Sequence, residues 1–126
     1  ANKIASLECE GDDWICSPTN KVRNGNTEHF AIVVSNKDNV QKEFDVDISY
    51  DDVDGKKGLT KDCGSIILNE YPKSIKVKSG ESSNFPFSVI ASRVSKVPCS
   101  FTTSARLIDL SDDSEIDITP IIIRVE

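Results

Sequence analysis

Apolar and polar residues alternate one by one along several segments of this chain. The clearest segment is residues 42–50 (KEFDVDISY), where every second residue from the third onward is apolar: Phe44, Val46, Ile48 and Tyr50. A repeat of two places successive side chains on opposite faces of a β-strand. We therefore predict a strand whose apolar face, Tyr50 included, lies in the core and whose acidic face is solvated, as in an antiparallel sheet.

The same alternation occurs on both sides of Gly80, within Pro72–Ala91. Ile75 and Val77 lie before a polar run, and a second apolar set lies after it: Phe85, Phe87 and Val89. Two alternating runs joined by a short segment that contains Gly favour a β-hairpin. We predict that the two runs pair with each other as antiparallel strands.

Shorter apolar runs predict further strands at residues 3–9, 28–36, 63–70, 101–109 and 115–126, with residues 51–58 (DDVDGKKG) as a flexible excursion. In the last strand the apolar phase changes at Pro120, so we expect Ile116 and Ile118 to point inward and Pro120 to mark a bulge or an edge. Many short strands and no amphipathic helix predict an all-β fold, an immunoglobulin-like antiparallel β-sandwich of about 7–9 strands in two sheets. We treat residues 1–126 as one domain, in which 1–24 supply an N-terminal strand and a disulfide-pinned loop.

Charge and hydropathy exclude several partners. The 126 residues carry a formal net charge of −6, which disfavours nucleic acid and anionic lipid surfaces. No apolar run approaches the roughly 20 residues that span a bilayer. The sequence starts at Ala1 and contains no Met, so we expect a processed or engineered start, with any membrane attachment made through a segment outside these residues.

Four cysteines, an even number in a strand-rich chain, indicate two disulfides and an oxidising compartment. Of the three pairings we favour Cys9–Cys16, which closes a short loop, together with Cys63–Cys99, which joins distant segments. A zinc site is disfavoured because no CxxC occurs. Free buried thiols are the remaining alternative.

Three segments in order, residues 25–50, 74–91 and 103–126, share a pattern of strand, Asn- or Gly-containing turn and alternating strand. Over about residues 25–126 the chain resembles CARDB-type and related immunoglobulin-like modules of archaeal and bacterial surface proteins. The resemblance implies a spacer, adhesion or assembly domain and not a catalyst. It also implies an alternative role, the ectodomain of a membrane-anchored accessory protein of archaeal motility or pilus machinery that binds the surface layer.

The loop 9–16 (CEGDDWIC) contains the single Trp of the chain. Trp14 has two interpretations. It packs as a lid over one end of the sandwich, which is the more common fate of a large aromatic side chain. Alternatively, Trp14 with Asp12 and Asp13 contacts a protein partner, and this is our candidate functional site.

Two acidic clusters are candidate calcium ligands: Asp51, Asp52 and Asp54 before Gly55, and Asp112, Asp113 and Glu115 near the last turn. Calcium takes six to eight oxygen ligands, which loops at one end of a sandwich can supply. Neither cluster has the spacing of an EF-hand loop, and Asp is frequent in turns because it stabilises them locally. Solvated turns are therefore the favoured interpretation, and calcium is the one cofactor that we keep as an alternative.

His29 is the only histidine, and no nucleophile elbow of the form G-x-S-x-G accompanies it. We therefore do not expect an enzyme. Our first hypothesis is a non-enzymatic, extracytoplasmic module that mediates protein–protein contact or assembly at a cell surface, with a cell-envelope component or a second copy of the chain as partner. Its contacts would come from loops or from an exposed strand edge. The second hypothesis is a calcium- or lipid-binding β-sandwich.

Overall fold

The chain folds into two β-sheets that face each other. The computed structural model describes residues 9–17, 20–70 and 74–126, and within them it contains eleven strands and no helix. One sheet has the order β1-β3-β9-β7-β6-β5, made by Ile15–Cys16, Thr27–Ser35, Ser82–Val94, Gly64–Glu70, Lys56–Lys61 and Asp51–Val53. The other has the order β2-β11-β10-β4-β8, made by Asn20–Val22, Ser114–Val125, Cys99–Asp109, Lys42–Ile48 and Ile75–Val77.

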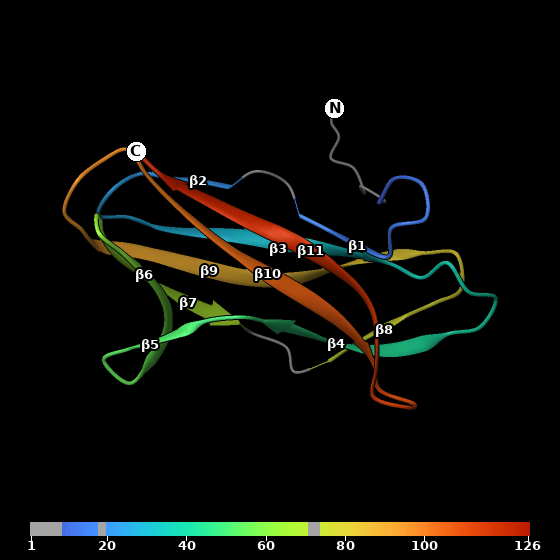
Figure 1. Cartoon of the computed structure of the whole chain (residues 1–126). Coiled ribbons are helices and arrows are strands. Elements are labelled where there is room, and N and C mark those ends of the chain that lie inside the picture. The colour runs from blue at the N-terminus through green and yellow to red at the C-terminus, as the bar shows by residue number, and fades with distance from the viewer. Residues whose placement is uncertain (1–8, 18–19, 71–73) are drawn as a thin grey trace.

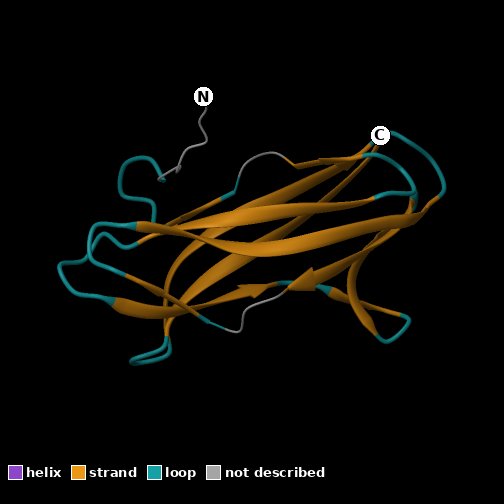
Figure 2. Cartoon of the chain, turned by 180° about the vertical axis from the view of Figure 1, so that it is seen from behind, coloured by secondary structure: helices purple, strands orange, loops and turns teal. Residues whose placement is uncertain are grey.

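The sheets form a long sandwich with loops at both ends (Figure 1). Consecutive strands change sheet repeatedly, at the β1–β2, β2–β3, β3–β4, β4–β5, β7–β8, β8–β9 and β9–β10 connections. Among the described strands, all pairings are antiparallel except that of β2 with β11. From behind, strands and loops alone make up the described fold (Figure 2). The predicted immunoglobulin-like β-sandwich of two sheets is confirmed, with eleven described strands where about 7–9 were expected.

The core lies between the sheets and is filled by the inward residues of each alternating strand. Its largest side chains come from both layers and are at most 1% exposed: Phe44, Phe85, Phe87 and Phe101. Burial of each such side chain stabilises the fold by roughly 1.5–3 kcal/mol. The period-two prediction is confirmed for β4 from Phe44 to Ile48 and for Phe85, Phe87 and Val89 of β9.

The predicted hairpin around Gly80 is wrong. β8 pairs with β4, whereas β9 pairs with β3 and β7, so the two runs belong to different sheets. The connecting segment crosses from one layer to the other, and Asn36 fixes it there by accepting from Gly80 N at 3.0 Å and donating to Glu81 O at 2.9 Å. Alternation predicts which residues point inward, but it does not say which strand is the neighbour.

Residues 51–58 are a hairpin and not a flexible excursion. β5 pairs with β6 through the two-residue turn Asp54–Gly55, in which both residues have positive φ (53° and 79°). This is the backbone of a type I′ turn, whose twist suits paired strands and which favours Asp-Gly. The charged residues concealed this hairpin signal. The strand predicted at residues 3–9 falls outside the described residues except for Cys9.

Two further predictions of inward-facing residues are also wrong. Tyr50 is 49% exposed because β4 ends at Ile48, and Lys57 Nζ lies 5.2 Å from the centre of its ring. Ile118 is 51% exposed, because the register of β10 and β11 shifts where Leu107 faces Asp117 and Ile108 faces Glu115. The bulge therefore lies at Ile116, and the inward phase of β11 runs unbroken from Thr119 to Val125.

Candidate functional site

Four connections meet at one end of the sandwich, opposite the C-terminus (Figure 1). We call this the loop end and define it as residues 9–14, 36–43, 78–81 and 109–115. Hydrogen bonds join residues 36–43 to each of the other three segments. Lys37 Nζ donates to Cys9 O at 3.0 Å, Ser79 Oγ to Asp38 O at 2.7 Å, and Leu110 N to Glu43 O at 3.1 Å. The four segments therefore form one connected surface.

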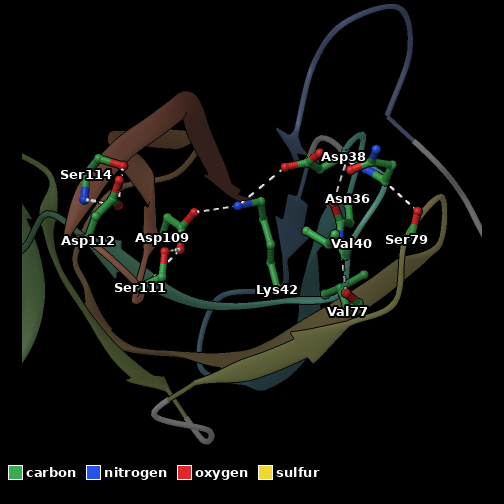
Figure 3. Close-up of polar contacts among 11 residues, drawn as sticks. Asn36, Asp38, Val40, Lys42, Val77, Ser79, Asp109, Ser111, Asp112 and Ser114 are labelled. Carbon is green, nitrogen blue, oxygen red and sulfur yellow. Dashed lines mark hydrogen bonds and ion pairs between the residues drawn. The ribbon is translucent and has the colours of Figure 1, made fainter.

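Asn36 holds the centre of this surface and is 1% exposed. Its Nδ2 donates to Val40 O at 2.8 Å and to Val77 O at 2.9 Å, while its Oδ1 accepts from Asp38 N at 2.9 Å (Figure 3). A short amide side chain replaces backbone partners in this way, which explains Asn at the end of a buried strand. The bonds fix the β3–β4 loop to β8.

An ion pair spans the middle of the loop end. Lys42 Nζ lies 2.9 Å from Asp109 Oδ2 and 3.4 Å from Asp38 Oδ2. Oδ1 of Asp109 accepts from the backbone N and the Oγ of Ser111, at 2.9 and 2.8 Å (Figure 3). Register explains the meeting, since Asp109 is opposite Phe44 on the neighbouring strand.

The electrostatics of this pair favour fixed charges. Hydrogen bonds from the Ser111 backbone, Lys42 and the Ser111 hydroxyl lower the pKa of Asp109 to about 2. The hydrogen bond to Asp109 raises the pKa of Lys42. General acid–base catalysis works best with a pKa near the operating pH, and a nucleophilic lysine needs a lowered pKa. Both shifts go the other way, so the pair is suited to structure and recognition.

Beside the ion pair is a shallow groove of about 380 Å³, lined by Val40, Gln41, Lys42, Glu43, Asp109, Leu110 and Ser111. Two of its side chains are apolar and exposed, Val40 at 52% and Leu110 at 39%. They come from the β3–β4 loop and the β10–β11 turn. The groove thus combines two apolar side chains with a hydrogen-bonded, charged floor.

The loop end also carries an excess of negative charge. Its residues comprise three lysines (Lys37, Lys42 and Lys78) and ten acidic side chains: Glu10, Asp12, Asp13, Asp38, Glu43, Glu81, Asp109, Asp112, Asp113 and Glu115. Ten negative and three positive side chains give the loop end a formal charge of −7, which is more negative than the −6 of the whole chain. The rest of the chain is therefore close to neutral.

Both favoured disulfides are formed, Cys9–Cys16 and Cys63–Cys99. The first closes the loop that holds Trp14, Asp12 and Asp13. The Trp14 ring packs against the core, 6.1 Å from the Phe44 ring and edge-on to it, while Asp12 and Asp13 are exposed at the loop end. Trp14 thus lies as a lid, and the partner contact by these three residues stays a prediction.

The structure separates the two acidic clusters that we considered for calcium. Asp51, Asp52 and Asp54 belong to the β5–β6 hairpin, whereas Asp112, Asp113 and Glu115 surround the β10–β11 turn at the other end (Figure 1). Several of these carboxylates already bind local groups: Asp52 Oδ1 accepts from Gly55 N at 2.7 Å and Asp112 Oδ1 from Ser114 Oγ at 2.7 Å. Within the described ranges no three metal-binding side chains converge. Calcium binding stays a prediction.

Several features of the sheet edges disfavour strand addition. The edge strands β1, β2, β5 and β8 have only two or three residues each. Beyond β2, the edge of β11 is blocked in another way. Glu126 exchanges backbone hydrogen bonds with Val22 and Asn24 on the β2 side, so even-numbered residues of β11 face that edge. Pro120 has no N–H to offer there, and Ile118 N already donates to Asp117 Oδ1 at 2.8 Å.

A second exposed apolar group lies on the outer face of β11, where Ile118 is 51% and Ile122 45% exposed, on either side of Pro120. On the neighbouring strand, Arg106 pairs with Asp47 and, at 3.5 Å, with Glu115. This face provides a natural comparison for the groove, because both surfaces expose two aliphatic side chains of similar size.

The sequence missed Asn36, Val40, Lys42 and Leu110. The signal for Asn36 was weak but present, since an Asn directly after an apolar strand commonly caps a turn. Leu110, an apolar residue within the polar turn DLSDDS, was visible but ambiguous. The Lys42–Asp109 pair joins residues 67 positions apart, so it requires the register of β4 and β10.

Among the described residues, no helix is long and apolar enough to cross a membrane. The sequence matches no family model and no curated protein. The CARDB resemblance therefore stays a prediction.

Several solved structures are similar in outline. A FixG-related protein from Vibrio parahaemolyticus is 19% identical with a TM-score of 0.49, and the match covers 79% of each chain. PapD-like domain 7 of human CEP192 is 10% identical with a TM-score of 0.48, covering 100% of this chain and 96% of that one. A non-cellulosomal cohesin from Archaeoglobus fulgidus is 13% identical with a TM-score of 0.47, covering 89% of each. Sequence identities and TM-scores this low do not indicate a shared function.

Proposed function

We propose that this protein is a non-catalytic, extracytoplasmic interaction module that binds a protein partner through its loop end. The observation that carries the proposal is the groove in which Val40 and Leu110 stand exposed beside the Lys42–Asp109 ion pair. Exposed aliphatic side chains on a rigid support are suited to bind a partner, because their surface is dehydrated on contact while the support loses little entropy.

Two properties support this surface over others, and a third supports the extracytoplasmic setting. The Asn36 hydrogen bonds hold the β3–β4 loop in one conformation. The edge strands have only two or three residues and the edge of β11 beyond β2 is blocked by Pro120, which disfavours binding by strand addition there. The two disulfides suit an oxidising compartment, and from them we infer an extracytoplasmic setting. A role at a cell surface, including that of an anchored accessory domain of archaeal motility machinery, is the finer form of the same proposal.

The test is a selection of peptides from a random library displayed on phage, with the protein immobilised through its C-terminus so that the loop end is free. Binders are then measured against two double variants. Val40→Ser with Leu110→Ser removes the apolar side chains of the groove. Ile118→Ser with Ile122→Ser removes the same kind of surface from β11 and is the matched control.

We expect the groove variant to weaken most selected peptides at least about fivefold, the loss typical of contact residues that matter, and the control to bind like the wild type. Both variants change exposed residues, so both should unfold at close to the wild-type temperature. Selected peptides that lose affinity only for the β11 variant would overturn the proposed binding surface.

A further inference from the structure

We propose that the partner segment bound at the loop end is cationic and carries an aliphatic or aromatic side chain that enters the groove between Val40 and Leu110. This inference rests on the proposed function and names the chemistry of the partner. It combines two independent properties of the surface, the exposed apolar pair and the charge that surrounds it.

The apolar part fits a single side chain. A groove of about 380 Å³ is small for a protein interface, and its exposed apolar walls are two side chains from two different loops. Such a site is suited to one anchoring residue of a longer segment, since a few central residues carry most of the affinity of an interface.

The charged part fixes the sign of that segment. The three lysines of the loop end are outnumbered by ten acidic side chains, and Lys42 is already paired with Asp109 and Asp38. Lys37 Nζ donates to Cys9 O, which ties it to the disulfide loop but leaves its charge in place. The field in front of the groove is therefore negative, which attracts Lys and Arg and repels acidic chains.

The arrangement of the carboxylates also favours a peptide over a single ion as the partner of this charge. Asp112 caps Ser114 and Asp109 binds Ser111 and Lys42, while Asp12 and Asp13 remain exposed on the disulfide loop. These carboxylates are spread over separate loops, which suits the spacing of cationic side chains along an extended peptide more than one compact ion.

The probes are three short synthetic peptides, alternating Lys with Leu, Lys with Ser, and Glu with Leu. Binding is measured by fluorescence anisotropy at low and high salt, and the site is mapped by amide chemical shifts. We expect the Lys-Leu peptide to bind most tightly, the Lys-Ser peptide more weakly and the Glu-Leu peptide not measurably. Salt should weaken binding several-fold, because exposed charges are screened.

Two charge variants separate local from overall attraction. Asp12→Asn with Asp13→Asn removes two charges from the loop end, and Glu28→Gln with Asp62→Asn removes two from β3 and from the β6–β7 turn. We expect the first pair of substitutions to weaken binding of the Lys-Leu peptide about threefold more than the second pair. Charges farther from the peptide than the Debye length of about 10 Å are largely screened. Equal losses, or shift changes outside the loop end, would overturn the inference.

The outcomes also separate this inference from the proposed function. If the Glu-Leu peptide binds at the groove as well as the Lys-Leu peptide, the partner is not cationic but the binding surface stands. If library peptides bind only elsewhere, both proposals fail.

Discussion

The backbone N of Trp14 donates a 2.9 Å hydrogen bond to Asp117 Oδ2, across 103 positions of sequence. This contact ties the disulfide loop to β11, while Trp14 O accepts from Ser35 N at 2.8 Å on β3. Because the loop is hydrogen-bonded to both β11 and β3, which belong to different sheets, it closes this end of the sandwich. The lid is therefore part of the support on which the loop end is built.

The first prediction concerns the lid. We expect Trp14→Ala to lower the free energy of unfolding by about 2–3 kcal/mol, less than for a fully buried aromatic because Trp14 is only partly buried. Trp14→Phe should cost less than half as much, since it can keep an edge-on contact with Phe44. Urea denaturation measures both. Unchanged stability of the Ala variant would show that the ring is not a lid.

The second prediction concerns Asn36. Its replacement by Ala leaves the carbonyls of Val40 and Val77 without their donor, so we expect a loss of about 2–3 kcal/mol in unfolding free energy. Asn39→Ala is the control, because Asn39 is exposed and should change stability by less than about 0.5 kcal/mol. Equal effects of the two substitutions would contradict the role of Asn36 as the centre of the loop end.

The third prediction concerns pH. The pKa of Asp109 is lowered to about 2 from an ordinary value of 3.8. A lowered folded-state pKa stabilises the protein fully above the unfolded-state value, and the benefit is lost as pH falls from about 4 to about 2. Asp109→Asn cannot titrate.

We therefore expect the stability difference between wild type and Asp109→Asn to be up to about 2 kcal/mol larger at neutral pH than near pH 2.5. Chemical denaturation at a series of pH values measures this difference. A gap that stays constant from neutral to acid pH would show that the Asp109 carboxylate is not held by Ser111 and Lys42.

The fourth prediction concerns calcium. Because the two acidic clusters lie at opposite ends and several of their carboxylates bind local groups, we expect millimolar calcium to shift the melting temperature by less than about 1 °C. Differential scanning fluorimetry with calcium and then EDTA measures the shift. A larger rise that EDTA reverses would establish a calcium site.

The sequence predicted what depends on local pattern. Alternation correctly placed Phe44, Val46 and Ile48 in the core, and cysteine spacing favoured the two disulfides that form. Local pattern failed to predict which strands pair with each other. β8 pairs with β4 because the chain crosses between layers at Gly80, and nothing in residues 75–89 encodes that crossing.

The candidate site was predicted less well for a related reason. Trp14 drew attention because large aromatics dominate interfaces, yet the loop end is set by side chains whose meeting depends on register, such as Lys42 and Asp109. Val40 carries no local signal of its own, and the signal of Leu110 within its polar turn is ambiguous. Their value comes from standing together on two loops that the fold brings to one end.

The most direct test of the account is an amide chemical-shift map with the tightest peptide from the library selection. We predict that the largest changes fall on residues 36–43 and 109–115, and that they disappear in the variant with Val40→Ser and Leu110→Ser. Changes centred on Ile118 and Ile122 of β11, or on the β5–β6 hairpin, would contradict the claim that this protein binds through its loop end.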